Sequence, residues 1–200
     1  MDPVTTRPVP IQVVLADSNV LYSRALRDYL LCAAEMEVVG VNWSQEILDE
    51  VTEHLVVNLP SFTEESAKAL TSALADTFPR AIVNPSAADY ARLADIALPD
   101  GDDRHVIAAA LAADAKIVCT GNVRHFPAAV MAQLGIVVMT PDELFTQLIY
   151  THLPQMVAAH RAAVAAFHRA TDESTLTALR RAGATKTADL MTAALGLTDN

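Results

Sequence analysis

The chain has 200 residues, of which 52% are hydrophobic and 19% are charged, and its formal net charge at pH 7 is −10. This composition excludes a disordered protein and suits one folded domain with a further appended segment. The acidic balance argues against a protein that coats nucleic acid, because neutralising phosphates requires an excess of lysine and arginine, but it leaves open a nuclease that uses metal ions and suits a basic protein partner.

The N-terminus and the cysteines indicate the compartment. Residues 1–10 contain three prolines, which predict a loose arm, and they lack the cationic and apolar regions of a signal peptide. No apolar run reaches membrane-spanning length, so we expect no membrane partner. The two cysteines, Cys32 and Cys119, lie in apolar segments and are expected to be buried free thiols. We therefore expect a protein of a reducing compartment, most simply the cytoplasm.

Strand and helix patterns alternate from residue 11 to residue 150. Short apolar runs predict strands, and apolar residues recurring three or four positions apart predict helices between them. The expected strands cover residues 11–16, 81–83, 116–119 and 135–139. The expected helices cover residues 20–33, 44–55, 63–78, 86–97, 106–113 and 140–150. This alternation predicts an α/β fold with a parallel sheet.

The pattern changes at Pro154. Residues 155–200 contain no strand pattern and predict about three short helices rich in Ala and Leu, broken near Thr171 and Gly183. A segment of this size holds too small a core to be stable alone, so we expect it to pack on the α/β body. The expected organisation is an arm over residues 1–10, an α/β domain over 11–150 and an all-helical appendage over 151–200.

The run from Leu98 to Pro127 carries much of the functional interpretation. An acidic turn ending at Asp103 precedes an apolar helix, and the strand that follows ends in Thr120-Gly121-Asn122. Ligands of open parallel sheets bind beyond the carboxyl ends of the strands, so Asp103 and Asn122 are expected to face one crevice. Asp17, directly after the first strand, and Glu50, in the helix after Ser44, are candidates for the same crevice.

Three carboxylates and an amide in one cleft need a compensating positive charge, because carboxylates a few ångströms apart repel one another. Oxygen ligands favour Mg²⁺ or Mn²⁺ over zinc, and such an ion can hold a phosphodiester for attack by an activated water. Plain structural roles stay open for the same residues. Asp17, Asp102 and Asp103 can be helix caps, Glu50 can be a solvated charge, and residues 120–122 can be a turn.

Four segments of the chain resemble the PIN-domain nucleases and, among them, the bacterial VapC-like toxins. These segments are VVLADSNVL, SQEILDEV, DDRHVIAAALAADAKIVCTGNVRHFP and GIVVMTPDELF, and the resemblance covers about residues 11–148. Their order and spacing are more specific than any one of them. The resemblance implies parallel strands flanked by helices, and a ribonuclease that depends on Mg²⁺ or Mn²⁺.

The resemblance also assigns individual acids. The family's first acid falls on Asp17, and Asn19 takes the place of a residue that orients it. The second acid falls on Glu50. The third falls on Asp103, because the family's alanine-rich helix starts directly after that acid. Two neighbouring acids remain alternative registers for the third position: Asp100 and Asp102.

The chain departs from the family at the fourth acidic position. Relatives often carry Asp at the site of Asn122 or of His125. Asn122 can still ligate a metal through its amide oxygen, and His125 can contact phosphate or assist proton transfer near neutral pH. Thr120 and Arg124 are accessory candidates, and a cation at Arg124 suits a phosphate.

The resemblance further implies an RNA substrate, a small cognate antitoxin that blocks the cleft, and self-association as a homodimer. A PIN fold that has lost catalysis and serves as a binding module is one alternative. Another is a receiver domain, because VVLADSNVLYSRALRDYL followed by MEVVGV resembles the start of such a domain. However, the stretch where its phosphorylated Asp belongs, EILDEVTEHL, is predicted to be helical. For residues 155–200 we expect a role in the RNA-binding rim or in antitoxin docking.

Overall fold

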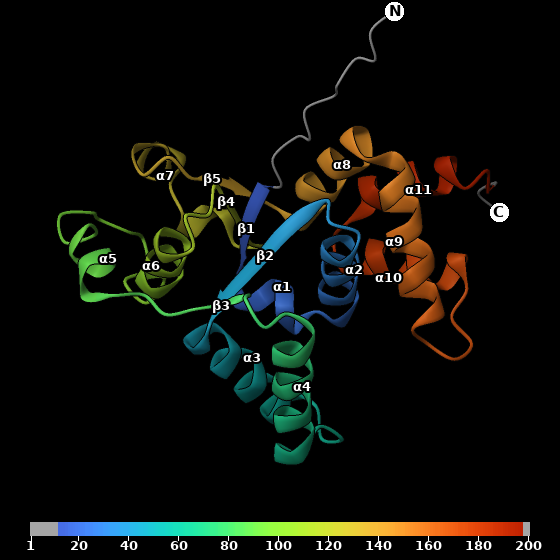
Figure 1. Cartoon of the computed structure of the whole chain (residues 1–200), viewed down its shortest axis with the longest axis horizontal. Helices are drawn as coiled ribbons and strands as arrows, with labels where there is room; N and C mark the ends of the chain where they lie inside the picture. Colours follow the sequence, from blue (N-terminus) through green and yellow to red (C-terminus); the bar gives the residue numbers. More distant parts are fainter. Residues whose placement is uncertain (1–11, 198–200) are drawn as a thin grey trace, which may run out of the picture.

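The computed structural model describes residues 12–197, so the arm expected over residues 1–10 lies outside the described part. A five-stranded sheet forms its centre (Figure 1). The strands are β1 (Gln12–Ala16), β2 (Val39–Ser44), β3 (Ile82–Val83), β4 (Ile117–Cys119) and β5 (Val137–Met139). Their order is β3-β2-β1-β4-β5, and every neighbouring pair is parallel. The predicted α/β class with a parallel sheet is confirmed.

Helices connect the strands, as parallel pairing requires. They are α1 (Ser18–Tyr22), α2 (Arg24–Glu35), α3 (Gln45–Asn58), α4 (Glu64–Thr77), α5 (Ala87–Ala91), α6 (Arg104–Ala112), the 3₁₀ turn η1 (Val123–His125), α7 (Ala128–Gln133), α8 (Pro141–Thr151), α9 (Leu153–Ala165), α10 (Asp172–Arg181) and α11 (Thr185–Ala194). Ser44 caps α3 by accepting a hydrogen bond from the Ile47 amide at 3.2 Å. Thr140 and Glu143 form a capping box at the start of α8.

Three expectations about local structure were wrong. The helix expected over residues 20–33 is two helices, because Ser23 between them is extended (φ −71°, ψ 108°). The helix expected over residues 86–97 ends at Ala91. Residues 39–43 were assigned no element and Ser44 was assigned to the next helix, yet residues 39–44 form β2, where Gly40 and Asn42 interrupt the apolar run. Gly40 and Asn42 alternate with buried residues, and this two-residue period is that of a strand with one face more exposed than the other.

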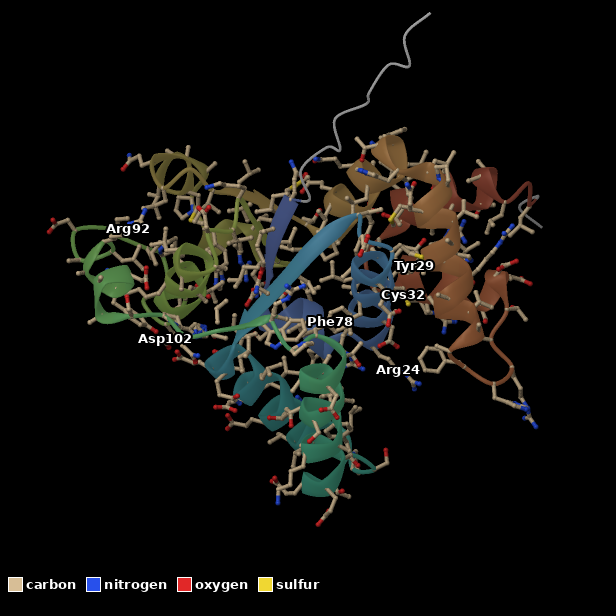
Figure 2. The ribbon with its side chains drawn as sticks, viewed as in Figure 1. Arg24, Tyr29, Cys32, Phe78, Arg92 and Asp102 are labelled. Atoms are coloured by element: carbon tan, nitrogen blue, oxygen red, sulfur yellow. The ribbon has the colours of Figure 1, made fainter. Side chains whose placement is uncertain are left out.

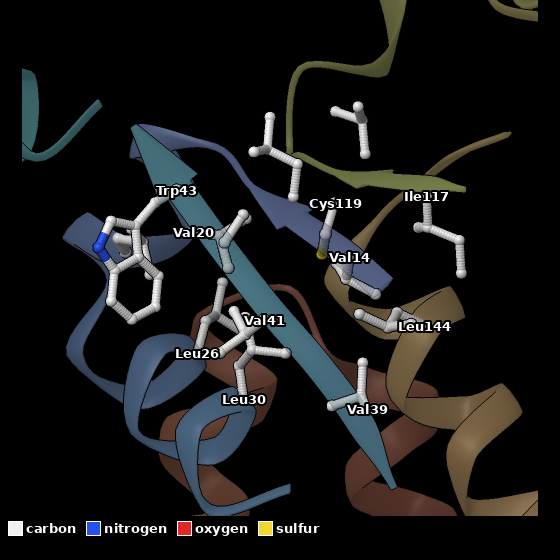
Figure 3. Close-up of a cluster of buried hydrophobic side chains, with 14 of the residues drawn as sticks. Val14, Val20, Leu26, Leu30, Val39, Val41, Trp43, Ile117, Cys119 and Leu144 are labelled. Atoms are coloured by element: carbon white, nitrogen blue, oxygen red, sulfur yellow. The ribbon is translucent and has the colours of Figure 1, made fainter. Parts of the chain in front are cut away.

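The core lies between the sheet and the helices. Val14, Val41 and Ile117 from the strands gather with Leu30 of α2 and Leu144 of α8 (Figure 3). Each is at most 7% exposed, and burying a side chain of this kind stabilises the fold by roughly 1.5–3 kcal/mol. The two cysteines are buried and free, as expected. No helix in the described part of the chain is long and apolar enough to cross a membrane.

The three C-terminal helices pack on the α/β body, as expected. α9 lies against α2, and α11 lies against α8 (Figure 1). The ring of Tyr29 on α2 contacts those of Phe145 on α8 and His160 on α9, with ring centroids 5.3 and 5.9 Å apart. Met156 and Met191 are fully buried in the same core as the strands. The α/β body and the C-terminal helices therefore share one hydrophobic core.

Candidate active site

The four residues proposed as metal ligands line one cleft. β1 and β4 are adjacent, with Ala16 opposite Cys119, so the residues that follow them meet at the same edge of the sheet. Asp17 and Asn122 come from these strand ends, Asp103 from the start of α6, and Glu50 from α3. Together they line a cleft of about 320 Å³. The remaining lining residues are Ser18, Asn19, Tyr22, His54, Asn58, Asp102 and His105.

Asp17 is held rigidly at the floor of this cleft. It is 5% exposed, and its carboxylate accepts hydrogen bonds from Thr120 Oγ1 at 2.6 Å, from the Ser18 amide at 2.7 Å and from Asn19 Nδ2. Burying a carboxylate is costly unless donors satisfy it, and these three do so. Asp17 also occupies the N-cap position of α1. Asp17 therefore caps α1, and Asn19 contacts the same carboxylate.

The turn after β4 approaches Asn19 closely. The Gly121 amide donates to Asn19 Oδ1 at 2.7 Å, and a Cβ atom at Gly121 would lie only 3.2 Å from that oxygen. Asn19 Nδ2 also donates to Thr120 Oγ1 at 3.0 Å, and Thr120 Oγ1 accepts from the Asn122 amide at 2.9 Å. A glycine at 121 thus lets the turn tie Asn122 to the network around Asp17.

Asp103 has a different environment. It is the N-cap residue of α6, but its side chain accepts no hydrogen bond from the helix, and its Oδ2 lies 3.0 Å from His125 Nδ1. Burial raises the pKa of Asp103, the hydrogen bond and charge of His125 lower it, and the charges of Asp100 and Asp17 raise it further. The pKa of this partly buried acid is therefore raised overall, and the hydrogen bond and charge of His125 oppose that rise.

His105 is a cleft residue to which sequence reasoning gave no role. It is 6% exposed, its Nε2 lies 3.2 Å from Glu50 Oε1, and its Nδ1 lies 3.5 Å from Glu46 Oε1. Glu46 and Glu50 are one turn apart on α3, so both face the first turn of α6. The signal in the sequence that could have indicated this contact was the spacing of four between Glu46 and Glu50, together with a histidine two residues after Asp103.

The remaining candidates divide between the cleft and its surroundings. Asp102 lines the cleft and is exposed, and in Figure 2 it lies far from Arg24 and Tyr29, which face the C-terminal helices. Arg124 is exposed on η1 and is not among the residues that line the cleft. Of the accessory candidates, Asn19 and Thr120 contact Asp17, and His125 contacts Asp103.

Comparison with known protein families agrees with this geometry. The family model of the PIN domain matches residues 13–124, which is more than half of the chain. The chain belongs to the PIN-domain family. Searches of the curated proteins and of the solved structures gave no match. The residues that match the family model include all four proposed ligands.

Membership of the PIN-domain family supports a nuclease-type function, and the strand order excludes the receiver alternative. Receiver domains have the order 2-1-3-4-5, in which the third strand lies beside the first. Here β4 lies beside β1, and β3 lies at the edge beyond β2.

The cleft of this PIN domain suits a hard divalent cation. Four carboxylates line it, those of Asp17, Glu50, Asp102 and Asp103, whereas no lysine or arginine does so in the described part of the chain. Acids that share one cleft repel one another and an incoming phosphate unless a cation joins them. The donor set, mostly carboxylate and amide oxygen, is the kind that Mg²⁺ and Mn²⁺ prefer.

Proposed function

We propose that this PIN domain is a Mg²⁺- or Mn²⁺-dependent endoribonuclease, the toxin of a type II toxin–antitoxin pair of the VapC-like kind, acting in the cytoplasm. The observation that carries the proposal is the gathering of Asp17, Glu50, Asp103 and Asn122 in one cleft without a lysine or arginine beside them. In a PIN domain, such a cleft suits a metal ion and the phosphate of a nucleic acid.

In this proposal Asp17, Glu50, Asp103 and Asn122 hold the ion. When bound, the ion supplies the positive charge that a phosphodiester requires in this cleft, and it favours ionisation of an attacking water. Thr120 and Asn19 keep the carboxylate of Asp17 in a fixed orientation. A fixed ligand matters because the reacting groups must meet without further reorganisation.

Glu50 is more open to solvent than Asp103. Its side chain is 38% exposed, compared with 20% for Asp103, so water reaches it more readily. Glu50 Oε1 lies 3.2 Å from His105 Nε2. One acid of the cleft, or a hydroxide held by the ion, takes the proton of the attacking water, and His105 holds the Glu50 carboxylate in place.

The charge of the molecule suits the proposed partners. A small antitoxin that places a basic residue among the acids of the cleft would meet a complementary surface on a chain of net charge −10.

The C-terminal helices pack on α2 and α8, away from Asp102, so antitoxin docking suits them better than shaping the rim of the cleft. Because they share the core, substitutions on the exposed face of α10 test this role more cleanly than a truncation at Pro154. We also propose a homodimer, which light scattering tests.

A cleavage assay with matched variants tests the nuclease proposal. Wild-type protein is expected to cut RNA with Mg²⁺ or Mn²⁺ and to stop when EDTA removes the metal. Asp17→Asn keeps the shape of the side chain and is expected to lower the rate by about 100-fold or more. Asp49→Asn is the control, because Asp49 is an exposed acid outside the cleft. Cleavage that persists in EDTA, or in Asp17→Asn at the rate of the control, contradicts the proposal.

One observation favours a second candidate, a PIN-fold module that binds without cutting. Asn122 and His125 stand where family members often have the fourth acid. Such a module would bind RNA or a protein partner, and neither metal nor Asp17→Asn would change a rate of cleavage. Purified wild-type protein that binds RNA in a gel-shift assay but does not cut it would support this alternative.

A further inference from the structure

One face of α3 continues the cleft beyond the proposed metal ligands. Glu50, His54 and Asn58 are four residues apart, so they project from the same face of the helix, and all three line the cleft. Tyr22, the last residue of α1, lines it from the neighbouring helix, because α1 packs beside α3 (Figure 1). We call Tyr22, His54 and Asn58 the aromatic part of the cleft. Unlike the carboxylate of Glu50, these three side chains carry no negative charge.

The two rings of the aromatic part contact each other edge to face. The ring centroids of Tyr22 and His54 lie 6.4 Å apart, and the ring planes are inclined at 83°. A contact of this geometry covers one face of only one of the two rings. Tyr22 is half-buried, His54 is exposed, and both line the cleft. Ring surface is therefore open to a ligand in the cleft.

The core holds both rings in place. Tyr22 directly follows Val20 and Leu21, which are both 0% exposed. His54 directly precedes Leu55, which is 5% exposed and anchors this turn of α3. The backbone next to each ring is thus fixed by burial, so a ligand that packs on the rings has little to order.

We propose that Tyr22 and His54 form a stacking platform for one unpaired base of the RNA, next to the phosphate held at the acids. Unstacked bases of single-stranded RNA pack on aromatic and histidine rings, and an uncharged base suits a part of the cleft that has no charged side chain. The rise of α3 places His54 about 6 Å beyond Glu50, within reach of the nucleotide whose phosphate lies there. The inference rests on the proposed ribonuclease function and specifies how its substrate is held.

The platform would select the conformation of the substrate more than its sequence. Every base has a π-face, so stacking tolerates all four bases. A base inside a duplex already stacks on its neighbours and is not free to pack on a protein ring. The proposed platform therefore makes single-stranded segments the substrate and excludes paired ones.

Fluorescence of 2-aminopurine tests the platform, because stacking on a ring quenches this base analogue. The probe is a single-stranded RNA pentamer with 2-aminopurine at its central position. Ca²⁺, which also takes oxygen ligands, replaces Mg²⁺ in the full chain, and a gel verifies that the RNA stays intact. Wild-type protein is expected to quench the fluorescence on binding. Unlabelled single strand should compete with the probe, and the same sequence in a duplex should not.

Matched variants separate stacking from a purely structural role of the rings. Tyr22→Phe keeps a ring and should retain the quenching. Tyr22→Leu and His54→Leu should each lose most of it and bind the pentamer at least about fivefold more weakly. Tyr150→Leu is the control, because Tyr150 is 66% exposed and does not line the cleft. Because His54 is exposed, His54→Leu decides the question even where Tyr22→Leu fails to fold.

Three results would overturn the inference: wild-type protein that leaves the fluorescence of the pentamer unchanged, quenching that persists in both leucine variants, or a loss in Tyr22→Phe as large as that in Tyr22→Leu. Cleavage of the same RNA in Mg²⁺ separates the two proposals. Cleavage without quenching refutes the stacking platform alone, whereas quenching without cleavage refutes the nuclease alone.

Discussion

Asp142 on α8 acts as the cap of a different helix, and removing its carboxylate should destabilise the whole molecule. The N-cap position of α11 is Ala184, which has no side-chain acceptor. The carboxylate of Asp142 instead accepts from the Lys186 amide at 3.1 Å, and from both the amide and the hydroxyl of Thr187 at 2.7 Å. Asp142→Ala removes all three of these acceptor contacts.

The size of the effect follows from burial. Thr187 is 0% exposed, so its amide would be left unsatisfied inside the protein, which costs about 1–3 kcal/mol. Loss of a negative charge at the start of α11 adds about 0.3–1 kcal/mol. The other two groups lose little, because the exposed Lys186 amide can donate to water instead. The Thr187 hydroxyl still donates to the backbone carbonyl oxygen of residue 142 at 3.2 Å. We expect Asp142→Ala to lower the free energy of unfolding by about 1–4 kcal/mol.

Urea unfolding followed by circular dichroism measures this difference, with Asp189→Ala as the matched control. Asp189 lies on α11 itself and forms a surface ion pair with Arg180 at 2.9 Å, with side chains 59% and 33% exposed. Surface pairs of this kind are worth at most about 1 kcal/mol. If Asp142→Ala costs no more than Asp189→Ala, then Asp142 does not cap α11 in the way described.

Three further predictions concern other parts of the molecule. Thr120→Val removes the donor to Asp17 and should slow RNA cleavage at least about tenfold while costing about 1–3 kcal/mol of stability; an unchanged cleavage rate would count against the orienting role. Burial lowers the pKa of His160 below 6.5, so the unfolded chain binds its proton more readily and stability falls as pH drops through that value. Urea unfolding should therefore show a larger loss between pH 7.5 and 5.5 for wild type than for His160→Gln, and equal losses would refute this. Burial raises the pKa of Cys32 to about 11 and also raises that of Cys119. A thiol reagent at pH 8 should therefore label both cysteines only after unfolding. Rapid labelling of the native protein would contradict the burial of these thiols.

Elements with strong local signals could be predicted from the sequence. Ser44, Thr63 and Thr140 were expected to begin helices, and each accepts a hydrogen bond from the backbone of the first turn. β1 and β4 are short apolar runs that end in polar residues, and the rule for parallel sheets correctly placed Asp17 and Asn122 at one edge.

What depends on tertiary packing could not be predicted. The break at Ser23 and the strand over residues 39–44 have weak local signals. His105 reaches Glu50 only because α3 and α6 meet beside the sheet. The choice between Asp100 and Asp103 as the third acid was also undecided in the sequence, and the structure brings both of them near His125.

The adjacency of β1 and β4 has a consequence for how the protein is made. The hydrogen bond between Thr120 and Asp17 joins residues 103 positions apart. A ribosome must therefore extend the chain beyond position 120 before that contact can close, and long-range strand pairing of this kind forms slowly. Until then, the nascent polypeptide carries Asp17 and Glu50 without the partners that complete the cleft, so a cell translating this message meets an assembled centre only late in synthesis.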